Sequence, residues 1–302
     1  MTKPGMIIDG QETLTKAVLD VMGRTSDPRL REIMLSLAKH LHGFVREVRL
    51  TEAEFRDAAA VINEMGKLAS DTHNETILMA GSLGVSSLVC LLNNGDNGET
   101  ETSQNLLGPF WRMHSPRTEN GGSIVRSRTP GPDLFVTFTI LDQVSKPIVD
   151  AEVDIWHSSP VGLYEQQDPE QADMNLRGKF VTDAKGKIWF RTVKPSGYPI
   201  PTDGVVGRLL AAQDRHPFRP AHVHALVFKP GFKTLTSQVY SDDDPRLATD
   251  VQFGVTRALT GRFVRHDAPE APPPGIQSPW YTLNHTFIME AGDAKLPKPP
   301  IK

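Results

Sequence analysis

The chain has 302 residues, a formal net charge of −3 and 23% charged residues, an ordinary globular balance that gives no sign of a nucleic-acid partner. Cys90 is the single cysteine, so an internal disulfide framework is excluded. The N-terminus lacks the pattern of a secretory signal, and the longest apolar stretch, residues 77–92, is short and interrupted by serines. We therefore expect a cytoplasmic protein with no membrane span.

Composition changes near residue 105. Only two of the 24 prolines precede that point, whereas all four tryptophans and all four tyrosines follow it. Because proline interrupts helices, the first third of the chain can be helical and the remainder can hardly be. We predict an α+β protein with a helical domain over residues 1–105 and an antiparallel β-sandwich over residues 106–302.

The first third carries clear helix signals. Asp27 followed by Pro28 is typical of a helix N-cap and first helical position. Thr51 and Glu54 have the spacing of a capping box, and apolar residues recur at helical spacing after both starts. Residues 77–92 are apolar nearly all round, which predicts one helix buried on several sides, by the chain itself, a second subunit or a ligand.

The remainder of the chain carries strand signals. Apolar residues alternate over residues 134–140, which predicts a half-buried strand. A turn signal at residues 183–186 predicts a hairpin between the flanking runs, 179–182 and 188–192. Two further strands are expected on either side of a Lys-Pro-Gly turn, at residues 221–228 and 234–240. Short strands without long helices between them favour a sandwich over a parallel sheet.

Two histidines and two tyrosines are the candidates for chemistry. His222 and His224 are two residues apart on an expected strand, so their imidazoles share one face and could bind one metal ion. Two half-exposed histidines on an edge strand are an equal alternative. Tyr164 and Tyr198 lie in loops rich in glycine and proline, where strand patterning does not place them. Two phenolates with two imidazoles would favour ferric iron, although a tyrosine bonded to a backbone carbonyl is the other interpretation.

Five stretches together resemble the intradiol ring-cleavage dioxygenases. They follow that family's order along the chain: residues 107–110 (LGPF), 154–164 (DIWHSSPVGLY), 176–183 (LRGKFVTD), 197–201 (GYPIP) and 219–224 (RPAHVH). The resemblance covers about residues 25–290. It implies that the helical domain serves dimerisation and that the sandwich is the catalytic domain.

The resemblance also implies roles for individual residues. Carried over position by position, the ligands of an Fe(3+) cofactor are Tyr164, Tyr198, His222 and His224. Three residues are implied in catalysis: Tyr198 as a base for a substrate proton, Arg219 to stabilise developing negative charge, and Gln238 at the reacting centre. The implied substrate-binding residues are Leu78, Gly81, Leu107, Pro109, Phe110, Arg219, Gln252 and Phe253.

Within the family, residues 83–86 (LGVS) and 198–204 (YPIPTDG) look most like the branch that cleaves hydroxyquinol, 1,2,4-trihydroxybenzene, to maleylacetate or 3-hydroxy-cis,cis-muconate. Gly81 stands where that branch usually has an aspartate, and Gln252 where it has a valine, while residues 156–157 are closer to the catechol branch. We expect Gly81 to leave space for a larger or differently charged ring substituent. Catechol or a substituted catechol is therefore the alternative substrate.

The implied partners are a catecholic substrate, O2 and a second copy of the chain. The resemblance implies a homodimer through the N-terminal helices, with a phospholipid in an apolar tunnel at the interface. An alternative of another class is a non-catalytic β-sandwich binding module with lipid-binding helices, in which the histidines are structural. Pure protein without iron and without visible colour would select that alternative.

Overall fold

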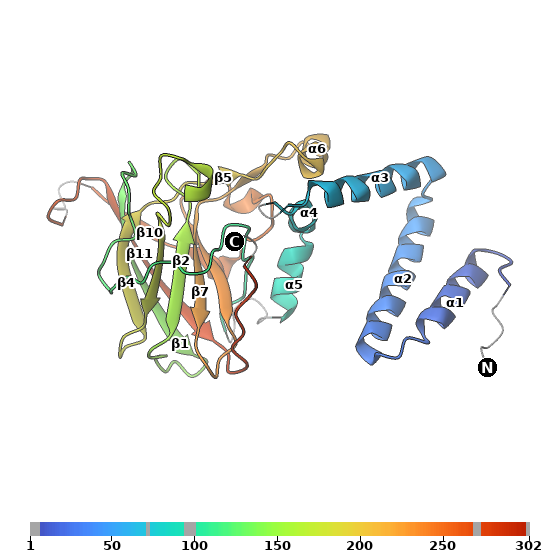
Figure 1. Cartoon of the computed structure of the whole chain (residues 1–302), viewed down its shortest axis with the longest axis horizontal. Coiled ribbons are helices and arrows are strands. Elements are labelled where there is room, and N and C mark those ends of the chain that lie inside the picture. The colour runs from blue at the N-terminus through green and yellow to red at the C-terminus, as the bar shows by residue number, and fades with distance from the viewer. Residues whose placement is uncertain (1–6, 71–72, 94–100, 268–272, 300–302) are drawn as a thin grey trace. The chain divides into compact units, whose positions relative to one another are not determined.

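The computed structural model describes residues 7–70, 73–93, 101–267 and 273–299 (Figure 1). The chain divides into two compact units, Met1–Asn63 and Glu64–Lys302. This division falls inside a helix, whereas the predicted boundary near residue 105 separates the first five helices from the first strand. The second unit therefore contains two of the N-terminal helices as well as all of the strands.

The first unit holds α1 (Gln11–Met22), α2 (Pro28–Val48) and the first part of α3 (Glu52–Leu68). Both predicted helix starts are confirmed. The Asp27 carboxylate accepts a hydrogen bond from the Leu30 N–H at 2.6 Å, and Thr51 and Glu54 exchange the two bonds of a capping box. Helices α1 and α2 are joined through Thr15, whose hydroxyl lies 2.9 Å from His42 Nδ1.

The apolar segment expected as one helix forms two, α4 (Glu75–Ser82) and α5 (Val85–Asn93), bent by 77°. The bend follows from Gly84, whose φ of 74° lies in the left-handed region that favours glycine. Ile77 and Leu88 are more than half exposed in the single chain, so the expected burial on several sides stays a prediction for a second subunit or a ligand. In the described part of the chain, no single helix is long and apolar enough to cross a membrane; only α4 and α5 counted together reach that length and composition.

Two sheets form the sandwich. One has the strand order β10-β11-β1-β4 and the other β3-β2-β7-β8-β9, with a separate β5-β6 pair. The strands are β1 (Asp133–Asp142), β2 (Glu152–His157), β3 (Arg177–Val181), β4 (Lys187–Val193), β5 (Tyr198–Pro199), β6 (Phe218–Arg219), β7 (His222–Phe228), β8 (Leu235–Ser241), β9 (Thr260–Gly261), β10 (Phe263–His266) and β11 (Trp280–Met289). Between β5 and β6 lies α6 (Val205–Ala212), and 3₁₀ turns occupy Glu165–Gln167, Leu247–Thr249 and Arg257–Leu259.

The sheets are mixed, so the prediction of a purely antiparallel sandwich is wrong in this detail. Strand β11 runs parallel to β1, and β9 runs parallel to β8. Parallel neighbours need a long connection, and β11 has one because it returns from the far end of the chain. The predicted α+β class, with helices first and a sandwich after them, is confirmed.

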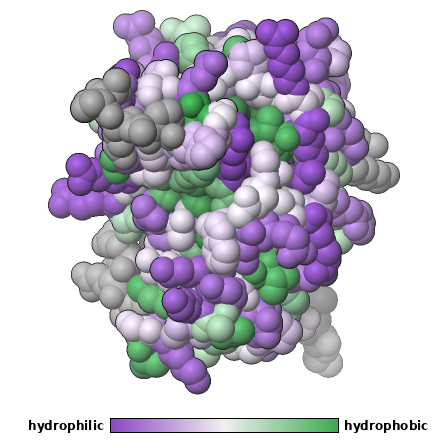
Figure 2. Space-filling view, turned by 90° about the vertical axis from the view of Figure 1, so that its left-hand side faces the viewer, coloured by the Kyte–Doolittle hydropathy of each residue, from purple (hydrophilic) through white to green (hydrophobic). Residues whose placement is uncertain are grey.

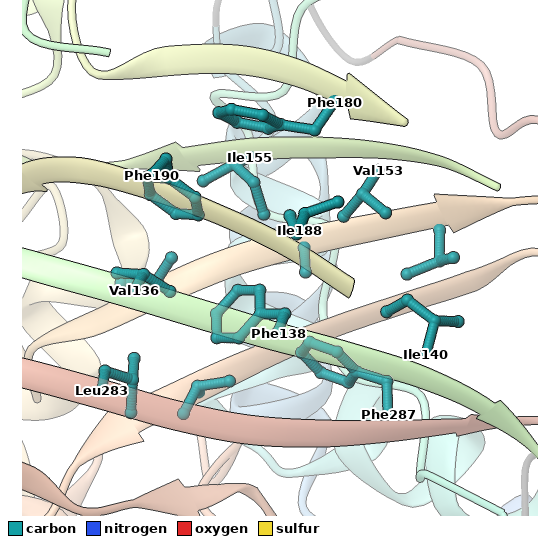
Figure 3. Close-up of a cluster of buried hydrophobic side chains, with 14 of the residues drawn as sticks. Val136, Phe138, Ile140, Val153, Ile155, Phe180, Ile188, Phe190, Leu283 and Phe287 are labelled. Carbon is teal, nitrogen blue, oxygen red and sulfur yellow. The ribbon is translucent and has the colours of Figure 1, made fainter. Parts of the chain in front are cut away.

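The core lies between the two sheets. Leu134, Val136, Phe138 and Ile140 of β1 are buried in alternation, as predicted. They meet inward-facing side chains of the other sheet, including Val153 and Ile155 of β2 (Figure 3). Hydrophilic residues cover most of the outer face seen in Figure 2, with small hydrophobic patches between them.

The two strands predicted around the Lys-Pro-Gly turn are confirmed, whereas the hairpin predicted at residues 183–186 is wrong. Strands β7 and β8 pair antiparallel across the Lys-Pro-Gly turn. The turn at residues 183–186 also forms, with Gly186 at a φ of 70°. Its flanking strands, however, join different sheets, because β3 pairs with β2 and β4 pairs with β1. The turn is therefore a crossing between the layers of the sandwich.

Candidate metal centre

The two candidate histidines lie together on the outer face of the five-stranded sheet. Their neighbours Val223 and Ala225 point into the core, so strand alternation sends His222 and His224 to the opposite face. Strand β7 lies between β2 and β8, and both imidazoles are buried. The alternative of a half-exposed pair on an edge strand is therefore excluded. Their Nε2 atoms are 3.1 Å apart.

Hydrogen bonding orients the first imidazole. His222 Nδ1 lies 2.7 Å from the carbonyl oxygen of Pro220, which can only accept, so the ring proton belongs on Nδ1 and Nε2 carries the free lone pair. Burial, together with the charge of Arg219, lowers the pKa of His222 to about 3. A neutral imidazole with a free Nε2 is the form that binds a metal ion.

The second imidazole is held by stacking. The rings of His224 and Trp156 are nearly parallel, with centroids 4.5 Å apart, and no hydrogen bond among the described residues reaches His224 Nδ1. Burial and the neighbouring His222 lower its pKa well below the ordinary value. Two neutral imidazoles therefore lie with their Nε2 atoms 3.1 Å apart.

The two tyrosines meet at the same place. The Tyr198 hydroxyl lies 3.5 Å from His222 Nε2, and the Tyr164 ring meets the Tyr198 ring edge-on at 5.5 Å. The Tyr164 hydroxyl is fully buried and has no hydrogen-bond partner in the described structure. A buried polar group without a partner is costly, so this oxygen calls for a ligand. We name these four residues, Tyr164, Tyr198, His222 and His224, the tyrosine–histidine cluster.

The donor set fits a hard cation. Burial, and then the neighbouring Tyr198, raise the pKa of Tyr164 well above its ordinary value, so its phenolate needs a compensating positive charge. Among the described residues, no group of three or more His, Cys, Asp or Glu could hold a metal ion. Two phenol oxygens beside two imidazole nitrogens would satisfy a metal with a preference for oxygen and nitrogen ligands.

The loop bearing Tyr164 is anchored by buried charges. Glu165 accepts a hydrogen bond from Arg177 Nε at 2.6 Å, and the Arg112 guanidinium lies 3.1 Å from the same carboxylate oxygen. Phe110 stacks on the Tyr164 ring with centroids 4.2 Å apart. The Tyr164 phenol is thus positioned by the hydrogen bonds of Glu165, its neighbour in sequence, and by the Phe110 ring stacked on its face.

Arg219 lies beside the cluster in β6, paired in register with Tyr198 of β5. It is buried against Asp250, with two contacts of 3.3 Å, and its Nη2 donates to Tyr240 at 2.6 Å. Burial alone would lower the pKa of the guanidinium, but the attraction of Asp250 raises it well above the ordinary value. Arg219 is therefore a permanent cation.

Gln238 faces His224 across the β7–β8 register. Its Oε1 accepts hydrogen bonds from Arg219 (3.1 Å) and Tyr240 (2.7 Å), while its Nε2 donates to the Leu106 carbonyl. Both ends of the amide are therefore fixed. Gln238 therefore links the Arg219 guanidinium to the backbone of Leu106.

The segment at residues 107–110 passes next to the cluster. Leu107 and Phe110 pack on the buried group that contains both tyrosines. A Cβ added to Gly108 would lie 3.3 Å from His224 Cε1, so the backbone itself approaches the imidazole. Pro109 is exposed.

The other predicted substrate-binding residues gather on α4 and the segment 250–254. Gln252 occupies the space beside Gly81, where an added Cβ would lie 2.7 Å from Gln252 Cδ. The expectation that Gly81 leaves free space is therefore wrong, because a buried side chain fills it. Leu78 packs on a buried apolar cluster that includes Ile200 and Val251. Phe253 is half exposed and lies on the Arg215 guanidinium.

Three contributors were not predicted. Tyr240 follows Gln238 by two residues on a strand, so alternation could have placed both on one face. Trp156 lies inside one of the quoted stretches, with no role predicted for it. Asp250 carries no local signal, because its pairing with Arg219 joins residues 31 positions apart through the fold.

The chain is similar to known dioxygenases over most of its length. A family described as "Dioxygenase" matches residues 106–274, and one described as "Catechol dioxygenase N terminus" matches residues 27–100. A hydroxyquinol 1,2-dioxygenase from Rhizobium sp. is 39% identical over 92% of this chain and 95% of its own. A catechol 1,2-dioxygenase from Candida albicans is 36% identical over 85% of each chain. The structure of a hydroxyquinol 1,2-dioxygenase from Pseudomonas putida superposes with a TM-score of 0.85 at 34% identity, covering 93% of this chain and 99% of that chain.

Proposed function

Because this chain belongs to the intradiol ring-cleavage dioxygenase family, we propose that it inserts both atoms of O2 into hydroxyquinol and cleaves the ring between two hydroxylated carbons. The product is maleylacetate or its 3-hydroxy-cis,cis-muconate form. The observation that carries the proposal is the tyrosine–histidine cluster, with its buried, unbonded Tyr164 hydroxyl. Hydroxyquinol is chosen because relatives at 35–39% identity over most of the chain carry that name.

Catechol or a substituted catechol is the second candidate substrate. It is favoured by Gly81 and Gln252, which place no carboxylate at that position. A relative at 36% identity is a catechol 1,2-dioxygenase. The two candidates share the vicinal diol and differ at the far edge of the ring. The side chains that the enzyme places at that edge therefore decide which substrate is preferred.

The cofactor is Fe(3+), held by Tyr164, Tyr198, His222 and His224. Neutral imidazoles and buried phenols are the ligands this chain offers, and two phenolates favour the trivalent ion. When bound, the ferric ion supplies Lewis acidity toward the two oxygens of a vicinal diol. Tyr198 would take a substrate proton at its Oη.

Arg219 stabilises negative charge that develops on the substrate. Its hydrogen bonds among the described residues use Nε and Nη2, which leaves Nη1 for a ligand. Asp250 and Gln238 hold the guanidinium in place before the reaction. A prepositioned cation in a buried site costs no reorganisation as charge develops.

The helical part would serve assembly. Leu37 and Leu41 of α2 are about half exposed in the single chain, as are Leu88 and Val89 of α5. A homodimer through the N-terminal helices, with a phospholipid in an apolar tunnel, would cover such side chains in a cytoplasmic enzyme. Light scattering gives the mass in solution, and mass spectrometry of an organic extract identifies any lipid. A monomer without lipid would refute this assembly and leave the catalytic proposal intact.

The central test is spectroscopic and kinetic. Purified protein should contain iron and absorb in the visible through phenolate-to-iron charge transfer. Oxygen uptake is then measured with hydroxyquinol, catechol, chlorocatechols and other substituted catechols. Iron-replete protein without colour would refute the tyrosinate ligands, and coloured protein that consumes no oxygen with any diol would refute the activity.

A further inference from the structure

Residues 250–254 and helix α4 together form what we call the wall of the site. The segment 250–254 is fixed to Asp250, the carboxylate that holds Arg219. Asp250 pairs with this arginine and also accepts hydrogen bonds from the backbone N–H groups of Gln252 (3.2 Å) and Gly254 (2.8 Å). On the other side, Ser87 of α5 donates to the Gln252 carbonyl at 3.0 Å. The backbone of Gln252 is therefore held between the catalytic arginine's partner and the helices.

Helix α4 completes this wall. Leu78 and Met79 pack against a cluster that includes Val251 and Ile200, and Ile200 is two residues from Tyr198. The wall thus adjoins the strand that carries a proposed ligand of the metal. The segment that carries Gln252 also adjoins Arg219, because a Cβ built on Gly254 would lie 2.9 Å from Arg219 Nη2.

Gln252 takes the position that a side chain at residue 81 would occupy. A Cβ built on Gly81 overlaps Oε1 of Gln252 and lies 2.7 Å from its Cδ. The amide is held there because Nε2 donates to Ser82 Oγ at 2.9 Å, and the residue is only 6% exposed. The φ of Gly81 is outside the left-handed region, so this contact, and not backbone strain, requires glycine.

We propose that Gly81 and Gln252 form one specificity-determining pair, in which glycine admits the amide and the amide offers an uncharged acceptor to the edge of the ring remote from the metal. The amide's hydrogen bonds among the described residues use Nε2, which leaves Oε1 for a ring hydroxyl. An uncharged acceptor is less costly to leave unpaired than a buried carboxylate. The site therefore accepts rings with a further hydroxyl and tolerates plain catechol. This inference rests on the proposed function.

A thermal double-mutant cycle tests the contact. Gly81→Ala should lower Tm by roughly 2–4 °C in the wild-type background because the methyl group displaces the amide. In the Gln252→Ala background the same change should raise Tm, since alanine is the better helix former. Gly66→Ala in α3, where an added Cβ meets nothing within 4 Å, should raise Tm in both backgrounds. Equal shifts for Gly81→Ala in the two backgrounds would overturn the pair.

Selectivity tests the role of the amide. The measured quantity is the ratio of specificity constants for hydroxyquinol and catechol, with iron content and visible absorbance as controls. Gln252→Leu should lower the ratio about 3- to 10-fold by removing the acceptor, and Gln252→Glu should raise it about 10-fold by introducing a charged one. An unchanged ratio in both iron-loaded variants would overturn the specificity role.

A carboxylate at position 81 requires a second change. Gly81→Asp alone would displace Gln252, whereas Gly81→Asp with Gln252→Val makes room and should raise the ratio. If the wild type lacks both iron and oxygen uptake, the proposed function fails and the specificity role falls with it. The thermal cycle still reports on the contact in that case, so the two failures are distinguishable.

Discussion

The tyrosine–histidine cluster and the wall formed by Gly81 and Gln252 are built in different ways. His222 and His224 owe their positions to strand alternation and to the register of β7 between its neighbours. The wall depends on a hydrogen bond between residues 170 positions apart, Gln252 and Ser82. The two proposed histidine ligands therefore rest on the five-stranded sheet. Selectivity rests on a contact between a helix and a loop, which can change without disturbing the sheet.

The largest expected effect breaks the cluster. Tyr164→Phe removes the buried hydroxyl that has no other partner, so iron content should fall and the visible band should largely disappear. Activity should fall more than about 100-fold, since even residues that only support a metal ligand typically matter 10- to 100-fold. Metal analysis and the visible spectrum of the purified variant check this prediction.

The matched control is Tyr281→Phe. Tyr281 is nearly buried in β11, within the sandwich core, and lies outside the cluster. Removing its hydroxyl should leave iron content, colour and oxygen uptake unchanged. Loss of colour in both variants would show that the absorbance does not report on the cluster.

The next effect concerns turnover without loss of the metal, and is expected from Arg219→Leu, which keeps the ligands and removes the cation. The turnover number should fall about 100- to 1000-fold, the usual consequence of losing a group that stabilises developing charge. The Michaelis constant should change much less. Steady-state oxygen uptake separates the two constants. A change confined to the Michaelis constant would make Arg219 a docking residue.

The Arg219→Leu variant needs a check on folding, because it leaves Asp250 buried without its partner. Breaking a buried pair typically costs about 3–5 kcal/mol of the free energy of unfolding. Arg219→Lys restores a positive charge and should recover part of the turnover. Kinetics are therefore measured below the Tm of each variant, with iron content determined in parallel.

The stability of the sandwich that carries the cluster should depend on pH through His157. Its ring lies 2.8 Å from the Ser158 carbonyl and 2.7 Å from the Thr192 hydroxyl, which joins the two sheets. Burial lowers its pKa to about 4, so the unfolded chain binds this proton near pH 6.5 and the folded chain does not. The contribution of His157 to the free energy of unfolding is therefore fully present above about pH 6.5. It falls by about 3 kcal/mol between about pH 6.5 and 4.

Replacing His157 with glutamine tests this prediction. The amide introduced by His157→Gln does not titrate, so the decline of Tm between about pH 6.5 and 4 should become shallower than in the wild type. His285→Gln is the comparison, since burial also lowers the pKa of His285 to about 4. An unchanged slope in His157→Gln would assign the acid sensitivity to other groups.

Much of the fold follows from local signals. The alternation in β1 and the caps of α2 and α3 depend on residues close in sequence, and these predictions are confirmed. The parallel β1–β11 pair could not be predicted because it joins opposite ends of the sandwich domain. The turn at Gly186 was visible, but the divergence of its strands into different sheets depends on packing.

The site divides in the same way. Spacing alone placed His222 and His224 on one face, and only the fold shows that they are buried and that the two tyrosines approach them. Gly81 and Gln252 were recognisable as unusual residues, but their contact was not, since no pattern in a single sequence links them.

The smallest effect on selectivity is expected from a substitution of Arg215. This residue holds the wall in place by hydrogen bonds. Its guanidinium donates to the Ser82 and Val251 carbonyls, both at 2.9 Å, and lies 4.8 Å from the centre of the Phe253 ring. Arg215→Met should cost about 1–2 kcal/mol of stability through the lost hydrogen bonds. A looser wall holds the Gln252 amide less firmly, so the hydroxyquinol-to-catechol ratio should fall about two- to threefold while iron content and colour stay unchanged.

The matched control for that substitution is Arg208→Met on α6. Arg208 pairs with Glu64 at 2.6 Å, but both side chains are substantially exposed, and such pairs contribute little. Both Tm and the substrate ratio should therefore stay near the wild-type values. If Arg215→Met instead lost iron, or slowed both substrates equally with an unchanged ratio, the wall and the cluster would be one mechanical unit. The separation between metal binding and selectivity would then be wrong.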